Sequence, residues 1–175
     1  MTVIAVLGSA PCGLDDLSAL KAMHSDVSVC ALNRSIFLPV EFAYFLTGHP
    51  SDFSDEVIRL KDSGRKLEAI GAERCSGYDT IFRPPGRMAW GGGAAYAICL
   101  FVPRGNRVVL CGCPFDTSGH FNDASLTYHA GELWDWFLLG HPHRAVLNVN
   151  VRSMSGQTRE LFGYPTKEWL NEPCQ

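Results

Sequence analysis

Two glycine-rich segments in this sequence could supply backbone N–H groups to a phosphate. The first, Gly8-Ser9-Ala10-Pro11, follows an apolar run, and the second, Gly91-Gly92-Gly93, precedes a stretch typical of a helix. The N–H groups at the start of a helix have no partner within it, and the helix dipole favours an anion there. A nucleotide with its phosphates would suit such segments, although both could equally be tight turns. Neither contains a Walker sequence or the G-x-G-x-x-G spacing of a dinucleotide site.

Further polar residues are expected near these glycines, because they stand at the ends of predicted strands. In a parallel sheet, ligands bind beyond the carboxyl ends of the strands. Residues 75–93 form an irregular segment with two prolines, five glycines and three aromatic residues. Its arginines could clamp a phosphate bidentately or simply be solvated, and its tryptophan could contact a sugar or base ring. The candidates at strand ends are Asn33, His49, Gly112 and Asp116, and those in the irregular segment are Arg83, Arg87 and Trp90.

The Tyr128-His129 pair is a candidate for acid–base chemistry. It precedes residues 131–140, an aromatic-rich segment that predicts an amphipathic helix. A sugar transfer to a hydroxyl needs a base that removes the acceptor proton, and histidine has a suitable pKa near neutrality. Tyr128 could support a leaving phosphate. The alternative is that His129 only caps the helix and that Tyr128 is a packing residue.

The histidines and cysteines do not have the spacing of a metal site. Zinc sites prefer C-x₂₋₄-C and H-x₃₋₅-H, whereas this chain has Cys111-x-Cys113 and His141-Pro142-His143. We therefore predict no metal ion. The seven cysteines are an odd number without regular spacing, and several stand in apolar runs. Reduced thiols in a cytoplasm are the simplest interpretation.

The candidate residues need a scaffold, and the order of predicted elements indicates an α/β fold. Apolar runs typical of buried parallel strands alternate with segments typical of helices. We therefore expect a single domain over 1–175, with a Rossmann-like, doubly wound, mostly parallel sheet and helices on both faces. The expected strands are 3–7, 27–33, 39–50, 66–72, 107–112 and 145–151, and the expected helices are 17–23, 54–64, 94–105, 131–140 and 158–163.

Length and composition fit one globular domain and exclude several classes of protein. The chain has 175 residues, of which 46% are hydrophobic and 19% charged, and nothing in this balance suggests disorder. Its net charge of −3 argues against broad nucleic-acid binding. No apolar stretch is long enough to cross a membrane, and the first residues lack the basic region of a signal peptide. The expected location is the cytoplasm, and a homo-oligomer is left open.

The order of these segments resembles that of the bacterial sialyltransferases that act on lipooligosaccharide, and of the related domain in flagellin-modifying glycosyltransferases. In that group a G-x-G-P-S-L turn follows the first strand, and the second strand ends in Asn. A later S-S/T-G-x-x-A segment opens a helix that leads into a strand ending in G-x-D. The corresponding segments here are G-S-A-P-C-G-L at 8–14, V-C-A-L-N at 29–33, W-G-G-G-A-A-Y-A at 90–97 and V-V-L-C-G-C-P-F-D at 108–116. Y-H-A-G-E-L-W-D-W-F at 128–137 is similar to the segment that carries the family's catalytic histidine.

The resemblance implies a glycosyltransferase that uses a nucleotide-sugar donor and no obligatory metal ion, with a CMP-sugar as one candidate donor. By this resemblance, Ser9 and Asn33 would contact the nucleotide-sugar. Gly91–Gly93 would lie on the phosphate side, and His129 would be the general base. The same resemblance implies the Rossmann-like fold that the alternation of strands and helices already predicts.

The sequence also departs from that family, and two other functions stay open. Pro114 stands where the family has the aspartate of G-x-D, with Asp116 two residues later, and glycines replace the serines before the helix. The chain is shorter than the family enzymes. One alternative is another nucleotide-phosphate-processing enzyme, such as a pyrophosphokinase-like protein, since the glycine turns favour a phosphate. The other is a non-catalytic module that binds a nucleotide or a partner protein, which the small size favours.

Overall fold

A seven-stranded sheet forms the centre of the fold, and every neighbouring pair of its strands is parallel. The structure is a computed structural model, and it describes residues 2–83, 92–114 and 149–172. The strand order is β5-β4-β3-β2-β1-β6-β7, so the chain leaves β1 toward one edge and then crosses back to β6. The strands are β1 (Val3–Leu7), β2 (Val27–Leu32), β3 (Tyr44–Thr47), β4 (Glu68–Gly71), β5 (Thr80–Ile81), β6 (Arg107–Cys111) and β7 (Val151–Ser153).

The two central strands show why the sequence forms this sheet. Every residue of β1 and of β6 is buried. Both strands are continuous runs of apolar residues, apart from Arg107 at the start of β6. A parallel strand that is covered on both faces requires such a run, because neither face meets water. Val3 of β1 lies opposite Val27 of β2 on one side and opposite Arg107 of β6 on the other. The sheet is therefore built outward from β1.

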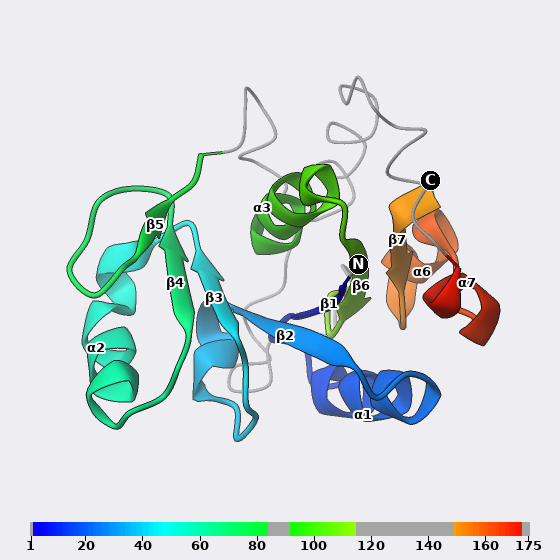
Figure 1. The fold of residues 1–175 in the computed structure, drawn as a ribbon, viewed down its shortest axis with the longest axis horizontal. Coiled ribbons are helices and arrows are strands. Elements are labelled where there is room, and N and C mark those ends of the chain that lie inside the picture. The colour runs from blue at the N-terminus through cyan, green and yellow to red at the C-terminus, as the bar shows by residue number, and fades with distance from the viewer. Residues whose placement is uncertain (1, 84–91, 115–148, 173–175) are drawn as a thin grey trace.

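Helices cover both faces of the sheet. Within the described ranges, the α-helices are α1 (Gly13–Met23), α2 (Ser54–Asp62), α3 (Gly92–Phe101), α6 (Gly156–Phe162) and α7 (Lys167–Asn171), and the 3₁₀ helices are η1 (Asn33–Phe37), η2 (Pro50–Asp52) and η4 (Val102–Arg104). Figure 1 shows α3 on one side of the sheet and α1 on the other. Buried residues of α3 and α6 share one apolar cluster, whereas those of α1, α2 and α7 share a second. The chain thus has the doubly wound, Rossmann-like α/β fold that the sequence predicts.

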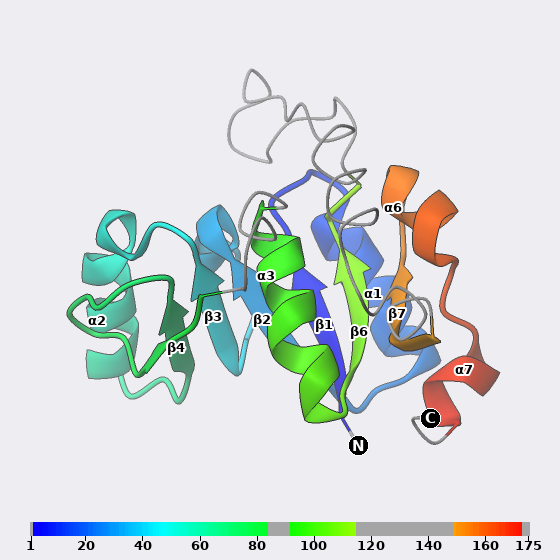
Figure 2. The ribbon, with the colours of Figure 1, turned by 90° about the horizontal axis from the view of Figure 1, so that it is seen from above.

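The character of each helix follows from its composition. α1 has Asp15 and Asp16 in its first turn and Lys21 in its last, charges that complement the helix dipole at each end. α3 has no acidic residue in its first turn and is apolar almost all round. A helix of that composition has to be buried, and six of its ten residues are. It lies across the middle of the sheet in Figure 2.

Most predicted elements are present, and two predicted strands need correction. The predicted strand over 39–50 is wrong in extent, because only Tyr44–Thr47 pairs with its neighbours. Leu38 and Phe42 are buried in the irregular segment before it. These apolar residues gave the sequence a strand-like pattern. Pro39, however, has no N–H that could donate a hydrogen bond to a neighbouring strand.

The predicted strand over 145–151 is also wrong in extent at its described residues, 149–151. Val149 and Asn150 are helical, and the strand β7 begins at Val151, where it pairs with Val108 of β6. Periodicity alone does not separate helix from strand in so short an apolar run. The predicted helix over 131–140 lies outside the described residues. Across the described ranges, no helix combines the length and apolar character that crossing a bilayer requires.

Candidate functional site

The carboxyl edge of the sheet brings together several of the candidate residues. Gly8 follows β1, Asn33 follows β2, His49 comes shortly after β3, and Gly112 follows β6. Because all these strands are parallel, the four residues lie at one edge, as predicted. The strand order reverses between β1 and β6, and the crevice at such a reversal is where open α/β sheets bind ligands. In Figure 2 the arrowhead of β6 and the end of β1 lie at this edge, with the start of α3 nearby.

Asn33 has a backbone conformation that marks it out at this edge. Its φ is +48°, the only positive value for a residue other than glycine within the described ranges. Asparagine tolerates this region better than most residues, because its short amide bonds locally. Here Asn33 Oδ1 accepts a hydrogen bond of 2.8 Å from Thr47 Oγ1, and Thr47 Oγ1 accepts one of 3.0 Å from His49 N. Thr47 is fully buried, so Asn33 is held by the end of β3.

The free end of the Asn33 amide faces the first turn of α3. A methyl group at Gly93 would place its carbon 3.3 Å from Asn33 Nδ2 and 3.3 Å from Leu32 Cδ1. Asn33 Nδ2 makes no hydrogen bond in the part of the chain that the structure describes. The structure therefore brings Asn33 and Gly93 together, although they are far apart in the sequence. Gly92, which opens α3, has a φ of +67°. We call Asn33, Thr47 and Gly93 the Asn33 corner.

The turn after β1 is arranged differently, because its N–H groups bond to the backbone after β6. Gly8 N donates to Cys111 O at 2.7 Å, and Ala10 N donates to Gly112 O at 3.2 Å. A side chain on Gly8 would overlap Gly112 O and lie 2.5 Å from Cys113 Sγ. The glycine at position 8 thus permits two loops to touch. Of the residues proposed for binding in this turn, Ser9 is the one with a polar side chain, and it is half-buried.

Asp16 and Ser155 join this contact, and the sequence did not identify them as a pair. Asp16 Oδ2 accepts hydrogen bonds from Gly112 N at 2.8 Å and from Ser155 Oγ at 2.6 Å. One carboxylate thus ties together α1, the loop after β6 and the turn before α6. Asp16 also stands in the first turn of α1, beside Asp15. We call Gly8, Gly112, Asp16 and Ser155 the β1–β6 junction.

The cysteines near the junction are not activated nucleophiles. Cys12 Sγ lies 3.5 Å from Ser155 Oγ. Burial raises the pKa of the Cys12 thiol, the Ser155 hydrogen bond lowers it in part, and the charge of Asp16 raises it further. The net pKa of Cys12 is above its ordinary value, so the thiol is protonated at neutral pH. Burial likewise raises the pKa values of Cys30, Cys111 and Cys113, in keeping with small apolar core residues.

Two other candidates lie at the carboxyl edge but farther along the sheet. His49 is exposed and immediately precedes η2. Arg83 is exposed beyond β5, the edge strand, and its Nε donates to Ala72 O at 2.6 Å. Neither side chain is brought to the β1–β6 junction by the described elements. The remaining candidates lie outside the described residues: Arg87, Trp90, Gly91, Asp116, Tyr128 and His129.

No group of three or more His, Cys, Asp or Glu side chains within the described ranges is arranged to hold a metal ion. Comparisons of this chain with protein-family models, with curated proteins and with solved structures found no match.

Proposed function

We propose that this chain binds a nucleotide or nucleotide-sugar at the carboxyl edge of its sheet, with the phosphates between the end of β2 and the start of α3. The observation that carries the proposal is the Asn33 corner. A side-chain amide donor stands against the first turn of an apolar helix, at the edge where open α/β sheets bind ligands. Asn33 also has a positive φ. Non-glycine residues in this conformation occur more often than average at functional sites, where the surrounding structure holds them in place.

The charges at the two helix starts favour α3 over α1 as the phosphate side. Asp15 and Asp16 already place two carboxylates in the first turn of α1, where a phosphate would be repelled. The first turn of α3 has no acidic residue, so its dipole is available to an anion. The glycines there permit a close approach of phosphate oxygens to the backbone. We assign Gly91, Gly92 and Gly93 to the phosphate side, with Asn33 and Ser9 as polar contacts.

The proposed reaction is the transfer of a sugar from the nucleotide to an acceptor hydroxyl. His129 acts as the base that removes the acceptor proton, and Tyr128 supports the leaving phosphate. Arg87 is the proposed phosphate clamp, and Trp90 the proposed contact for a sugar or base ring. Arg83, which lies beyond β5 and bonds to Ala72 O, is not assigned to the phosphates. This assignment is supported by the resemblance to bacterial sialyltransferases, which makes a CMP-sugar the first donor to test. No metal ion is required in this scheme.

The experiment is a binding screen followed by one isosteric substitution. CMP, UMP and GMP, and sugar conjugates such as CMP-N-acetylneuraminate and UDP-glucose, are tested by thermal unfolding and by calorimetry. A nucleotide at a hundred times its Kd stabilises the fold by about 2.7 kcal/mol. Asn33→Asp keeps the acceptor for Thr47 and tolerates the positive φ, but it replaces the amide donor by a negative charge. We expect the affinity to fall about tenfold or more, which corresponds to about 1.4 kcal/mol.

Asn171→Asp is the matched control, because it makes the same chemical change at an exposed position of α7. It should leave the affinity unchanged. Equal affinity of Asn33→Asp and the unaltered protein, or no binding of any nucleotide, would contradict the proposal. Binding without any transfer or hydrolysis of the sugar would instead identify a non-catalytic nucleotide-binding module.

A further inference from the structure

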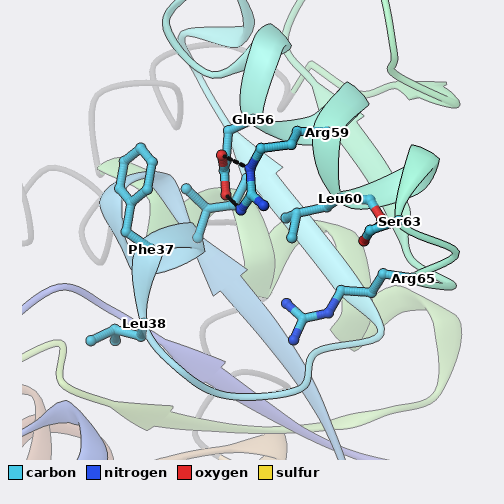
Figure 3. A pocket seen from close by; sticks show the side chains of 8 residues that line it. Phe37, Leu38, Glu56, Arg59, Leu60, Ser63 and Arg65 are labelled. Atoms are coloured by element: carbon cyan, nitrogen blue, oxygen red, sulfur yellow. Dashed lines mark hydrogen bonds and ion pairs between the residues drawn. The ribbon is translucent and has the colours of Figure 1, made fainter.

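A separate pocket lies between η1 and α2, on the face of the sheet opposite α3. Its volume is about 410 Å³, within the range of small-molecule sites. Figure 3 shows the side chains that line it. They come from the end of η1 and the residue after it, from α2, and from the segment that leads to β4: Ile36, Phe37, Leu38, Glu56, Arg59, Leu60, Ser63 and Arg65.

Three of the residues that line this pocket have apolar, largely buried side chains. Ile36, Leu38 and Leu60 are buried and belong to the core cluster that α1 and α2 share. Phe37 stands at the rim with 54% of its surface exposed, and its ring lies 6.3 Å from that of Phe53. An exposed aromatic ring beside an apolar wall can bury the hydrocarbon part of a ligand.

One of the two arginines at the pocket is already neutralised. Arg59 donates to both oxygens of Glu56, from Nε at 2.8 Å and from Nη2 at 2.6 Å. These hydrogen bonds, with a smaller contribution from the charge of Arg65, hold the pKa of Glu56 below its ordinary value. The pair is therefore ionised at neutral pH and carries no net charge. Figure 3 shows this pair at one side of the pocket.

Arg65 supplies the remaining charge. Its guanidinium carbon lies over the Phe42 ring, 4.9 Å from the ring centre, in a cation–π contact. Within the described ranges, no acceptor bonds to this guanidinium. Figure 3 shows it turned away from Ser63 and toward the side of the pocket where Leu38 lies. The pocket thus has one uncompensated positive charge, presented by a group whose donors suit a carboxylate bidentately.

We propose that this pocket binds a small organic acid that carries one carboxylate and an apolar body. The carboxylate pairs with Arg65, and the apolar body lies against Leu38, Ile36 and the ring of Phe37. The proposal does not depend on the nucleotide site, because the two sites use no residue in common, although η1 contributes Asn33 to one and Ile36 and Phe37 to the other. A nucleoside phosphate fits this pocket poorly, because its two or more negative charges would face one free cation and the carboxylate of Glu56.

The probe for this site is benzoate, and its neutral counterpart benzamide is the matched control. A ¹H–¹⁵N NMR titration reports both the affinity and the residues affected. We expect benzoate to bind with millimolar affinity and to shift the signals of Phe37, Ser63 and Arg65. Benzamide has the same shape without the charge, so it should bind at least about fivefold more weakly, since hydrogen bonds between charged groups are the stronger ones.

Two substitutions test the two halves of the proposal. Arg65→Gln should lower the affinity for benzoate about tenfold, to the level of benzamide, whereas Lys66→Gln, at the exposed neighbouring residue, should not. Phe37→Ala removes only an exposed ring, so the protein should still fold and bind both probes more weakly.

The proposal is overturned by equal binding of benzoate and benzamide, or by unchanged benzoate binding in Arg65→Gln. It is also overturned if tens of millimolar benzoate shift only signals near Asn33, or no signals at all.

Discussion

The starts of α1 and α3 lie at the same edge of one sheet, and both follow glycine-rich segments, yet they differ in what the glycines do. At the β1–β6 junction, a side chain on Gly8 would overlap backbone atoms of Gly112, and one on Gly112 would overlap backbone atoms of Gly13 and Gly8. At the Asn33 corner, a methyl group on Gly93 would instead meet a side-chain amide and an apolar side chain. Glycine serves loop-to-loop packing at the first place and access to a polar group at the second.

The charges follow the same division. α1 receives its own carboxylates, one of which is engaged by Gly112 N and Ser155 Oγ, so the positive end of this helix is already occupied. α3 receives none in its first turn. In a sheet with two candidate phosphate sites, the helix start without an acidic residue is the one to which we assign an anion. Three substitutions test whether the two helix starts differ in this way.

The largest expected effect is on turnover. With a donor bound at the Asn33 corner, His129→Ala should lower the rate of sugar transfer by about 10²–10⁴-fold and leave donor affinity nearly unchanged. The base must be unprotonated, so the wild-type rate should fall as pH drops through the histidine pKa, and the variant should lose this limb. The measurement is a pH–rate profile with donor affinity determined alongside. A folded variant with full transferase activity would remove His129 from the mechanism.

The next effect is on stability and tests the junction. Gly8→Ala forces a methyl group into Gly112 O and Cys113 Sγ, so the free energy of unfolding should fall by about 3 kcal/mol. Gly48→Ala is the control, since no atom lies within 4 Å of its added methyl group. It should change stability by less than about 1 kcal/mol. Urea unfolding measures both variants. If Gly8→Ala and Gly48→Ala had similar free energies of unfolding, the two loops would have to move apart at the junction at little cost.

The smallest effect is on affinity and tests the corner. Gly93→Ala places a methyl group over the Asn33 amide, so nucleotide affinity should fall about tenfold, or about 1.4 kcal/mol. Stability should change by less than about 1 kcal/mol, because alanine favours a helix. Gly92 is a poorer test, since its φ of +67° strains any side chain. Calorimetry of Gly93→Ala, Asn33→Asp and the double variant measures the coupling, and strictly additive losses would contradict a shared phosphate contact.

Much of the scaffold could be predicted from the sequence, because its signals are local. The apolar run of β1 and the acidic start and basic end of α1 each lie within one element, and the structure has both. The polar residues expected at strand ends, such as Asn33, also lie where the parallel arrangement puts them. The local sequence pattern was therefore enough to predict those strands and helices whose signals lie within a single segment.

The contacts that make the site specific could not be predicted in the same way. Asp16 and Ser155 are 139 positions apart, and nothing in either neighbourhood indicates the other. The φ of Asn33 and its bond to Thr47 depend on how β2 and β3 align, which the sequence does not state. The sequence indicates the same phosphate-binding role for Gly8 and Gly93, because their different neighbours come from distant segments. A glycine looks the same whether it admits a ligand or another loop.

The position of β1 in the sheet has a consequence for how the chain is made. β1 pairs with β2 on one side, only about 20 residues later, but its other partner, β6, follows about 100 residues later. On a ribosome that adds about 5–20 residues per second, one edge of this wholly apolar strand lacks that partner for about 5–20 s. During that interval the first five strands can assemble in chain order, with one edge of β1 open. An unpaired strand edge is a template for pairing with another chain, so this open edge is the place where two nascent chains would most readily aggregate.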